Sequence, residues 1–301
     1  MTAPPEILIL GGRPEGWHGA RLREALATLG AGVVRLDFRA LGLTAGAGNG
    51  IAGIDALPDA VLVRSIPAGS FEEVTLRLGI LHALASLGVA VVNPVRAIER
   101  CVDKSMTSFL LHRAGLPTPP TWATQSADEA RALCRREAAE GHRTVLKPLF
   151  GAQGRGLRLL DGDTDLPPPE EVGGVYYLQR FVGPGEGGWR DFRVFVVGGR
   201  AIAAMSRHGL GWVTNIGQGG RAEAADAGGV LAELAVAAAA AVGAAHAGVD
   251  LIPVAAGGYS ILEVNSMPAW QGLQSVTEID VAFHLAQDVL ARASPGRSVA
   301  A

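Results

Sequence analysis

The sequence predicts an α/β protein with an α+β arrangement in its C-terminal half. Up to about residue 93, strand-like and helix-like segments alternate, which is typical of a parallel sheet flanked by helices. From residue 143 to residue 214, short apolar strands separated by turn signals dominate instead. The chain has 301 residues, of which 49% are hydrophobic and 18% charged, so it is globular and long enough to bury large cores.

Four strands and two helices are expected in the first third. The strands are the apolar runs at 6–10, 33–37, 60–64 and 89–93. The helices are the segments with helical spacing at 16–30 and 71–88, and the Gly-rich segment 42–53 is expected to be a loop.

Further along, helices are expected at 103–115, 127–141 and 280–292, with Asp103 as N-cap and Gly115 as C-cap of the first. The apolar segment 231–249 is mostly alanine and carries a glutamate, which indicates a buried packing helix rather than a membrane span. Approximate boundaries near residues 94 and 185 divide the chain into three expected units: 1–93, 94–185 and 186–301.

Charge and cysteine content restrict the class of protein. The net charge is −3, and no run of Lys or Arg forms a stripe or tail, so nucleic acid is not an expected partner. Cys101 and Cys134 make no disulfide framework, and the N-terminus lacks a basic region and a cleavage pattern. A cytoplasmic protein without membrane attachment is therefore expected.

The segment 248–265 reads as two apolar strands around a turn at 255–258, interrupted by acids. With that turn, Asp250 lies opposite Glu263, with Cβ atoms roughly 4.5–5.5 Å apart. Side chains alternate along a strand, so Asn265 shares their face. The same register predicts the pairs Ile252–Ile261 and Val254–Tyr259. It turns three other side chains to the opposite face: Leu251, Leu262 and Val264.

Two opposed carboxylates repel each other, and the sequence leaves three ways to relieve this. One carboxyl group keeps its proton, a divalent cation lies between them, or the strand end is solvated. Two carboxylates and an amide oxygen form a hard oxygen site that suits Mg²⁺ shared with phosphates.

Three further segments carry candidate anion-binding groups. Lys147 ends a strand before a loop that contains Gly151, Gly154 and Gly156, which allow close backbone approach to an anion; an ordinary turn is the alternative. Lys104 lies in the first turn of a helix, where a phosphate would offset its unfavourable position beside the helix dipole, unless the side chain simply points into water.

Arginines on two successive strands form the third candidate. Asp191 and Arg193 share one face of a strand, and Arg207 ends the next one. Arginine forks suit phosphate or carboxylate recognition, with surface ion pairing as the alternative. Near the N-terminus, Trp17 and His18 follow a Gly-rich turn that is not a dinucleotide fingerprint, so packing or surface roles are expected for them.

The order of seven motifs between about residues 91 and 290 resembles the ATP-grasp superfamily, specifically its RimK-type amino-acid ligases. The motifs are VDKSMTSFLLHRAGLPTP, VLKPLFGAQGRGL, YLQRFV, DFRVFVVGGRAIAAM, TNIGQGG, AGVDLI and ILEVNSMPAWQGLQ. The resemblance implies an ATP-grasp fold preceded by a Rossmann-like parallel-sheet domain.

The resemblance also implies a role for each matching residue. Lys104 and Lys147 match lysines that hold the ATP phosphates, and the loop with Gly151, Gln153 and Gly154 matches the mobile lid above them. The adenine-reading hinge is matched by Gln179, Arg180, Phe181 and Val182. Asp191 matches the acid that binds the ribose, with Arg193 beside it, and Asn215 lies near the phosphates. Arg207 matches the arginine at the transferring phosphate, and the Mg²⁺ ligands are matched by Asp250, Glu263 and Asn265.

Three segments depart from the family pattern. Arg180 replaces a hinge glutamate, residues 213–215 replace Arg-Ser-Asn, and residues 217–220 replace His-Arg-Gly-Gly. These departures concern the pockets for the amino acid and the acceptor and leave the metal site unaffected.

The implied activity is that of an ATP-dependent ligase that uses Mg²⁺, usually as a pair of ions, with Mn²⁺ as the alternative. It joins an amino acid, L-glutamate, to an acceptor carboxylate through an acyl phosphate. The acceptor is expected to be a pterin or furan one-carbon coenzyme; the alternatives are a protein C-terminus or an amino-group carrier protein. A nucleotide-binding regulator without ligase activity is the alternative of another class. Relatives of this type suggest a homodimer or homotetramer.

Overall fold

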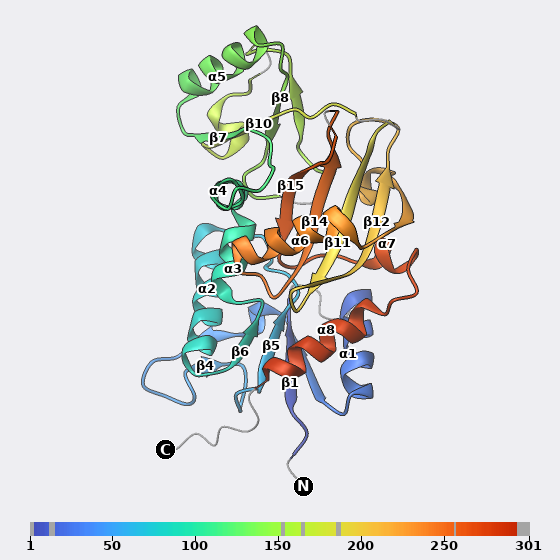
Figure 1. Cartoon of the computed structure of the whole chain (residues 1–301). Coiled ribbons are helices and arrows are strands. Elements are labelled where there is room, and N and C mark those ends of the chain that lie inside the picture. Colours follow the sequence, from blue (N-terminus) through green and yellow to red (C-terminus); the bar gives the residue numbers. More distant parts are fainter. Residues whose placement is uncertain are drawn as a thin grey trace.

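The computed structural model describes residues 3–11, 16–151, 154–163, 166–184, 188–255 and 257–293, and its strands form three main sheets (Figure 1). The first is parallel, in the order β2 (Gly32–Leu36), β1 (Glu6–Leu10), β5 (Ala60–Val63) and β6 (Ala90–Val92). Both faces of its central strands are buried, which explains their uninterrupted apolar runs. The expected parallel sheet is confirmed.

Helices cover both faces of the first sheet. On one face lie α2 (Phe71–Ser86) and α3 (Val95–Val102), and on the other α1 (Trp17–Thr28) and α8 (Val281–Arg292). The last helix of the described chain therefore returns to pack on the first sheet (Figure 1).

The second sheet is antiparallel and lies at one end of the molecule (Figure 1). Its order is β7 (Thr121–Thr124), β10 (Tyr176–Arg180), β8 (Thr144–Lys147) and β9 (Arg158–Leu160), and α5 (Ala127–Ala139) packs on one face. Helix α4 (Lys104–Arg113) connects this part with the rest, and Asp103 caps it by accepting hydrogen bonds from two backbone N–H groups, as expected. Gly115 follows its C-cap with a positive φ of 70°.

The third sheet is antiparallel and carries most of the candidate site. Its order is β13 (Arg221–Ala225), β12 (Arg200–His208), β11 (Arg190–Val197), β14 (His246–Pro253) and β15 (Tyr259–Asn265). The expected Ala-rich helix is α6 (Gly229–Val242), which ends where Gly243 adopts a positive φ, so residues 246–249 belong to a strand instead. None of the described helices is long and apolar enough to cross a membrane.

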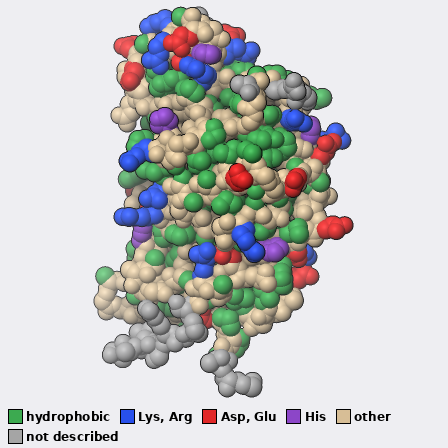
Figure 2. Space-filling model, viewed as in Figure 1, with side chains coloured by type: hydrophobic (Ala, Val, Ile, Leu, Met, Phe, Trp, Pro, Cys, Tyr) green, Lys and Arg blue, Asp and Glu red, His purple; other side chains and the backbone are tan. Residues whose placement is uncertain are grey.

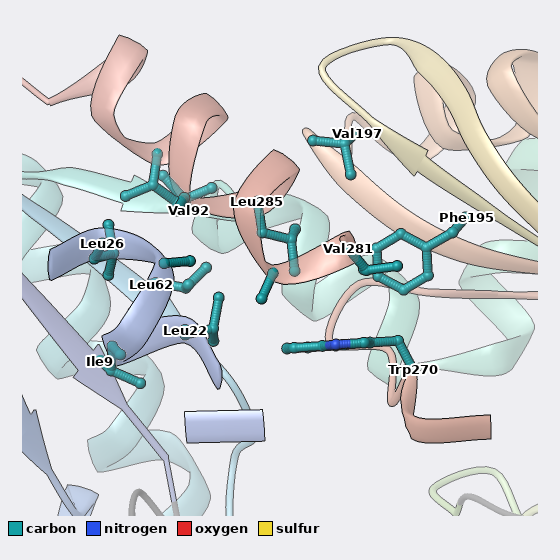
Figure 3. Close-up of a cluster of buried hydrophobic side chains, with 14 of the residues drawn as sticks. Ile9, Leu22, Leu26, Leu62, Val92, Phe195, Val197, Trp270, Val281 and Leu285 are labelled. Atoms are coloured by element: carbon teal, nitrogen blue, oxygen red, sulfur yellow. The ribbon is translucent and has the colours of Figure 1, made fainter. Parts of the chain in front are cut away.

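The two faces of the third sheet pack against different partners. Small side chains recur along α6 at helical spacing, and they pack on the face of β11 that carries Val194 and Val196. On the opposite face, Phe195 lies beside Trp270 and the α8 residue Val281, in the cluster that joins this sheet to the first one (Figure 3). In the space-filling view, hydrophobic side chains cross the middle of the molecule near α6, and charges of both signs are scattered around them (Figure 2).

Asn93 fastens the first sheet to the third. It is fully buried, and its Nδ2 donates to the carbonyl oxygens of His246 and Ser266. Its Oδ1 accepts the backbone N–H groups of Ala245 and His246 at 2.6 and 2.9 Å. One side chain thus fixes the start of β14 and the end of β15, the two strands that carry the predicted metal ligands.

The structure also contains elements that the sequence did not predict. They are α3, β7, β13, the short helix α7 (Gln271–Gln274), three 3₁₀ helices (Phe38–Ala40, Pro169–Val172, Ile216–Gln218) and the hairpin of β3 (Gly42–Leu43) with β4 (Ile51–Ala52). That hairpin lies inside the segment expected to be a loop. Strand β13, with the sequence RAEAA, has little intrinsic strand preference and forms at the edge offered by β12.

Candidate active site

The hairpin of β14 and β15 brings the predicted metal carboxylates together. Asp250 lies opposite Glu263, and Gly248 lies opposite Asn265, so the pairing expected from the sequence is confirmed at these positions. The Nδ2 of Asn265 donates to Glu263 Oε1 at 2.9 Å. The two carboxylates and the amide therefore form one polar group at the end of an otherwise apolar hairpin.

A β-bulge overturns the rest of the predicted register. The pairing shifts by one residue directly after Asp250, so the expected pairs nearer the turn are wrong. The observed pairs are Leu251–Ile261, Ile252–Ser260 and Pro253–Tyr259. Leu262 is the extra residue, and it lines the same cleft as Glu263 instead of pointing to the opposite face.

Two arginines hold the acids in a buried network. The Nε and Nη2 of Arg193 both donate to Asp250 at 2.7 Å. Arg207 Nη2 lies 2.9 Å from Asp250, and its Nε donates to Asp191 at 2.8 Å, with Nη2 as a second donor. Burial acts to raise the pKa of Asp250, but Arg193 and Arg207 outweigh it and keep that pKa below its usual range.

The donor set fits a hard divalent cation. Among the described residues, no three His, Cys, Asp or Glu side chains form a metal cluster, and the predicted donors are two carboxylates and one amide. Glu263 is partly exposed to the cleft, and its closest cation, Arg193 Nη2, lies 3.8 Å away. Asp250, in contrast, already accepts from two guanidinium groups, so Glu263 offers the freer oxygen atoms.

Two lysines face these acids, Lys147 from the end of β8 and Lys104 from the start of α4. Lys147 Nζ donates to Gln179 Oε1 at 2.6 Å, and Lys104 Nζ donates to the carbonyl oxygen of Gly151 at 2.6 Å. Burial lowers the pKa of Lys147 to about 8, although Glu263 acts to raise it. Burial lowers the pKa of Lys104 as well. Both lysines would gain from an anion in the cleft, which would favour their charged forms.

An open cleft lies between the second and third sheets. The predicted residues that line it are Lys104, Lys147, Gly151, Gly154, Gln179, Arg180, Phe181, Val182, Asp191, Arg207, Asn215, Asp250 and Glu263. Arg193 and Asn265 reach it through Asp250 and Glu263, and Gln153 lies outside the described residues.

The Gly-rich loop touches the segment after β12 across this cleft. Gly154 has a φ of +67°, and a Cβ placed there would lie 2.5 Å from Asn215 Oδ1 and 3.0 Å from Val213 Cγ1. Only glycine fits such a close contact with a left-handed backbone. The loop expected to act as a lid therefore packs closely against Asn215 and Val213 at the cleft.

The unusual hinge residue Arg180 has a partner of its own. Its Nε donates to Glu137 Oε2 at 2.6 Å and its Nη2 to Glu137 Oε1 at 3.1 Å, and the side chain of Glu137 is only 2% exposed. Arg180, which replaces the glutamate of the family pattern at this position, is therefore paired with the acid Glu137 on α5. Phe181, the next residue, lies against the rings of Trp189 and Trp212.

The cleft also has an apolar wall that was not predicted from the sequence, formed by Val145, Leu157, Trp212, Ile252 and Leu262. Val145 and Ile252 carried a usable signal, because each lies two residues from a predicted site residue and therefore shares its strand face. Trp212 lies in an irregular segment without periodicity, and only the bulge places Leu262 on this side.

Known proteins resemble this chain over most of its length. A family model described as the RimK-like ATP-grasp domain matches residues 101–289. The tetrahydromethanopterin:alpha-L-glutamate ligase of Methanococcus maripaludis is 36% identical over 208 residues, which cover 67% of this chain and 70% of that protein. The protein of the same name in Methanosarcina acetivorans is 36% identical over 260 residues, covering 75% and 78%. A probable alpha-L-glutamate ligase of Xanthomonas oryzae is 35% identical, covering 73% and 78%.

Solved structures share the fold at lower identity. The ATP-grasp ligase PsnB with a minimal precursor has a TM-score of 0.72 and 24% identity, covering 97% of this chain and 100% of that one. The D-cycloserine synthetase DcsG has a TM-score of 0.73 and 20% identity, covering 96% and 100%. The fold is thus the ATP-grasp fold, and the chain belongs to the family of the RimK-like ATP-grasp domain.

Proposed function

We propose that this protein is an ATP-dependent ligase that joins the amine of L-glutamate to a carboxylate of an acceptor. The observation that carries the proposal is the cleft itself, where Lys104 and Lys147 face the opposed carboxylates Asp250 and Glu263. Cations for phosphates and hard oxygen ligands for a divalent metal are what ATP-dependent phosphoryl transfer requires. The family and the names of the relatives agree with it.

ATP would lie between the second and third sheets. Val145, Trp212 and Ile252 offer apolar surface for the adenine, beside the hinge that contains Phe181 and Val182. The lysines would hold the phosphates under the loop of Gly154, and Asp191 would reach the ribose. Asp191 already accepts a hydrogen bond from Arg207, so its carboxylate would have to bind Arg207 and the ribose at the same time.

Asp250, Glu263 and Asn265 would hold Mg²⁺ or Mn²⁺, as a pair of ions if the site follows the family pattern. When bound, the metal supplies positive charge that neutralises the phosphate oxygens. Arg193 positions Asp250 through two hydrogen bonds, and Arg207 lies between Asp191 and Asp250 as a fixed cation for the transferring phosphate.

The chemistry needs no nucleophile from the protein. An acceptor carboxylate oxygen attacks the γ-phosphorus of ATP, the bond to the bridging oxygen breaks, and ADP leaves an acyl phosphate behind. The glutamate amine then attacks the acyl carbon and loses a proton, and phosphate departs with the formation of the amide. Lys104, Lys147 and Arg207 would stabilise the negative charge, and the Gly-rich loop would exclude water that hydrolyses the acyl phosphate.

We propose tetrahydromethanopterin or a similar pterin as the acceptor, because two of the relatives described above carry that name. The test is to incubate the protein with Mg·ATP, L-glutamate and tetrahydromethanopterin and to follow ADP and the product mass. A product larger by one glutamate supports the proposal. ADP release that depends on another carboxylate corrects the acceptor alone, and no acceptor-dependent ADP release with any carboxylate refutes the ligase.

Glu263→Gln tests the metal assignment in the same assay. The change preserves the shape of the side chain and removes the negative charge that faces the cleft, so turnover should fall at least a hundredfold, an order of magnitude typical for the loss of a preorganised charged group. Circular dichroism should stay that of the wild type. Turnover within a few-fold of wild type would contradict the assignment.

A further inference from the structure

Arg64 is a partly buried cation that the proposed chemistry does not use. It follows β5 directly, at the carboxyl edge of the parallel sheet, and its Nη2 donates to the carbonyl oxygen of Pro268 at 2.8 Å. Its Nε and Nη1 are buried and have no hydrogen-bond partner within the described part of the chain. Buried N–H groups of a charged guanidinium are unfavourable when unpaired, so this position is ready for an anionic partner.

The surroundings of Arg64 hold its side chain in place without neutralising it. Its Cζ lies 4.5 Å from the centre of the Trp270 ring, and His18 packs edge-on against the same indole. His18 Nε2 accepts the backbone N–H of Trp270 at 3.1 Å, and burial lowers the pKa of His18 to about 4, so this imidazole is neutral. Among the described residues, no acid forms an ion pair with Arg64.

Other buried polar atoms gather at the same junction. The indole Nε1 of Trp270 also has no hydrogen-bond partner among the residues that the structure describes, although the ring is fully buried. Figure 3 shows this ring between the cluster of the first sheet and Phe195 of the third. An anion beside Arg64 could therefore accept from the indole as well as from the guanidinium.

The position is connected to the metal carboxylates by direct contacts. Pro268, whose carbonyl oxygen binds Arg64, has its Cβ 2.8 Å from where a Cβ on Gly248 would lie. Gly248 is opposite Asn265 and two residues before Asp250. Since a strand advances about 3.3 Å per residue, Arg64 lies on the order of 10 Å from the carboxylate pair, roughly the length of a small dicarboxylate.

We propose that Arg64 binds a carboxylate of one of the two substrates, either the incoming amino acid or the acceptor. The bound molecule would extend from Arg64 toward the reacting centre beside Asp250 and Glu263. The end of a planar guanidinium, formed by Nη1 and the free hydrogen of Nη2, matches a carboxylate. The carboxyl edge of a parallel sheet is a common place for ligands. The proposal rests on the ligase function proposed above.

The test compares Arg64→Met with Arg190→Met. Arg190 is a matched control: its Cζ lies 5.6 Å from the Phe192 ring, its buried Nε also has no partner, and it lies on the face of the third sheet turned toward α6. For both variants and wild type, KM is measured for L-glutamate and for tetrahydromethanopterin. Binding of a non-hydrolysable ATP analogue and the circular dichroism spectrum report on the nucleotide site and the fold.

We expect Arg64→Met to raise one of the two KM values about tenfold to a hundredfold, the loss expected for hydrogen bonds to a charged group. Arg64→Met should bind the ATP analogue as wild type does, and Arg190→Met should have wild-type KM values for both substrates. If the affected substrate is L-glutamate, wild type should discriminate against its α-amide or its γ-amide, and Arg64→Met should lose that discrimination. If it is tetrahydromethanopterin, the acceptor is the source of the carboxylate.

Both KM values within twofold of wild type in Arg64→Met would overturn the proposal and leave Arg64 a packing role. If this variant does not fold, Arg64→Gln decides in the same way, because it retains an amide donor for the Pro268 carbonyl and lacks the charge. Wild type without activity toward any acceptor would instead refute the ligase function, so the two failures can be told apart.

Discussion

Replacing Asn93 by alanine should weaken the connection between the first and third sheets. The substitution removes four hydrogen bonds and leaves the backbone groups of Ala245, His246 and Ser266 without this partner in a fully buried place. At roughly 0.5–1.5 kcal/mol each, the four bonds amount to about 2–6 kcal/mol. Since domains are stable by only about 5–15 kcal/mol, the effect should be large.

Urea unfolding followed by tryptophan fluorescence measures this effect, with Asn49→Ala as a matched control. Asn49 accepts from the backbone of Ile51 at 2.9 Å and donates to that of Ile54 at 3.3 Å, so its bonds stay within one loop. We expect Asn49→Ala to lower the free energy of unfolding by about 1–3 kcal/mol, half the range for Asn93→Ala, because it removes two hydrogen bonds instead of four. A loss in Asn93→Ala no greater than that of the control would refute the reasoning.

Three further predictions concern the ionisable side chains of Arg180, Lys147 and His246. Arg180→Ala should lower the free energy of unfolding by about 2–4 kcal/mol, because the buried Glu137 carboxylate loses both hydrogen bonds from Arg180 and keeps only the longer contact with Arg136 at 3.7 Å. Adding Glu137→Gln should recover part of the loss in urea unfolding; no recovery would contradict the pairing. The affinity for ATP without metal, measured by calorimetry, should fall up to about tenfold per pH unit above pH 8, because Lys147 loses its proton there. Lys147→Arg should make this affinity nearly independent of pH. A wild-type affinity that stays constant from pH 7 to 9.5 would contradict the assignment. Burial lowers the pKa of His246 from 6.5 to about 3, so below pH 6.5 only the unfolded chain takes up that proton, and stability declines as the pH falls toward 3. By pH 5 this loss is about 2 kcal/mol, and His246→Phe should lack it; equal acid sensitivity of both proteins would contradict the assignment.

The local patterns of the sequence were enough to predict the main elements and the central acids of the site. The alternation of apolar strands and helices predicted the parallel sheet, and a short turn was enough to place Asp250 opposite Glu263. Both predictions depend on interactions between residues close in the chain, or on a periodicity that one buried face imposes. The order of the motifs then indicated the family.

The tertiary structure decided what the sequence pattern left open. The bulge after Asp250 moves Leu262 into the cleft, Glu137 provides a partner for Arg180 from a helix 43 residues away, and burial changes the pKa of Lys147. The junction of Arg64 with Trp270 joins residues 206 positions apart in the chain. Pairings of this kind depend on which surfaces are buried against each other. A one-dimensional pattern carries little information about them, because the contact distance, the desolvation and the partner's charge arise only when the three sheets pack together.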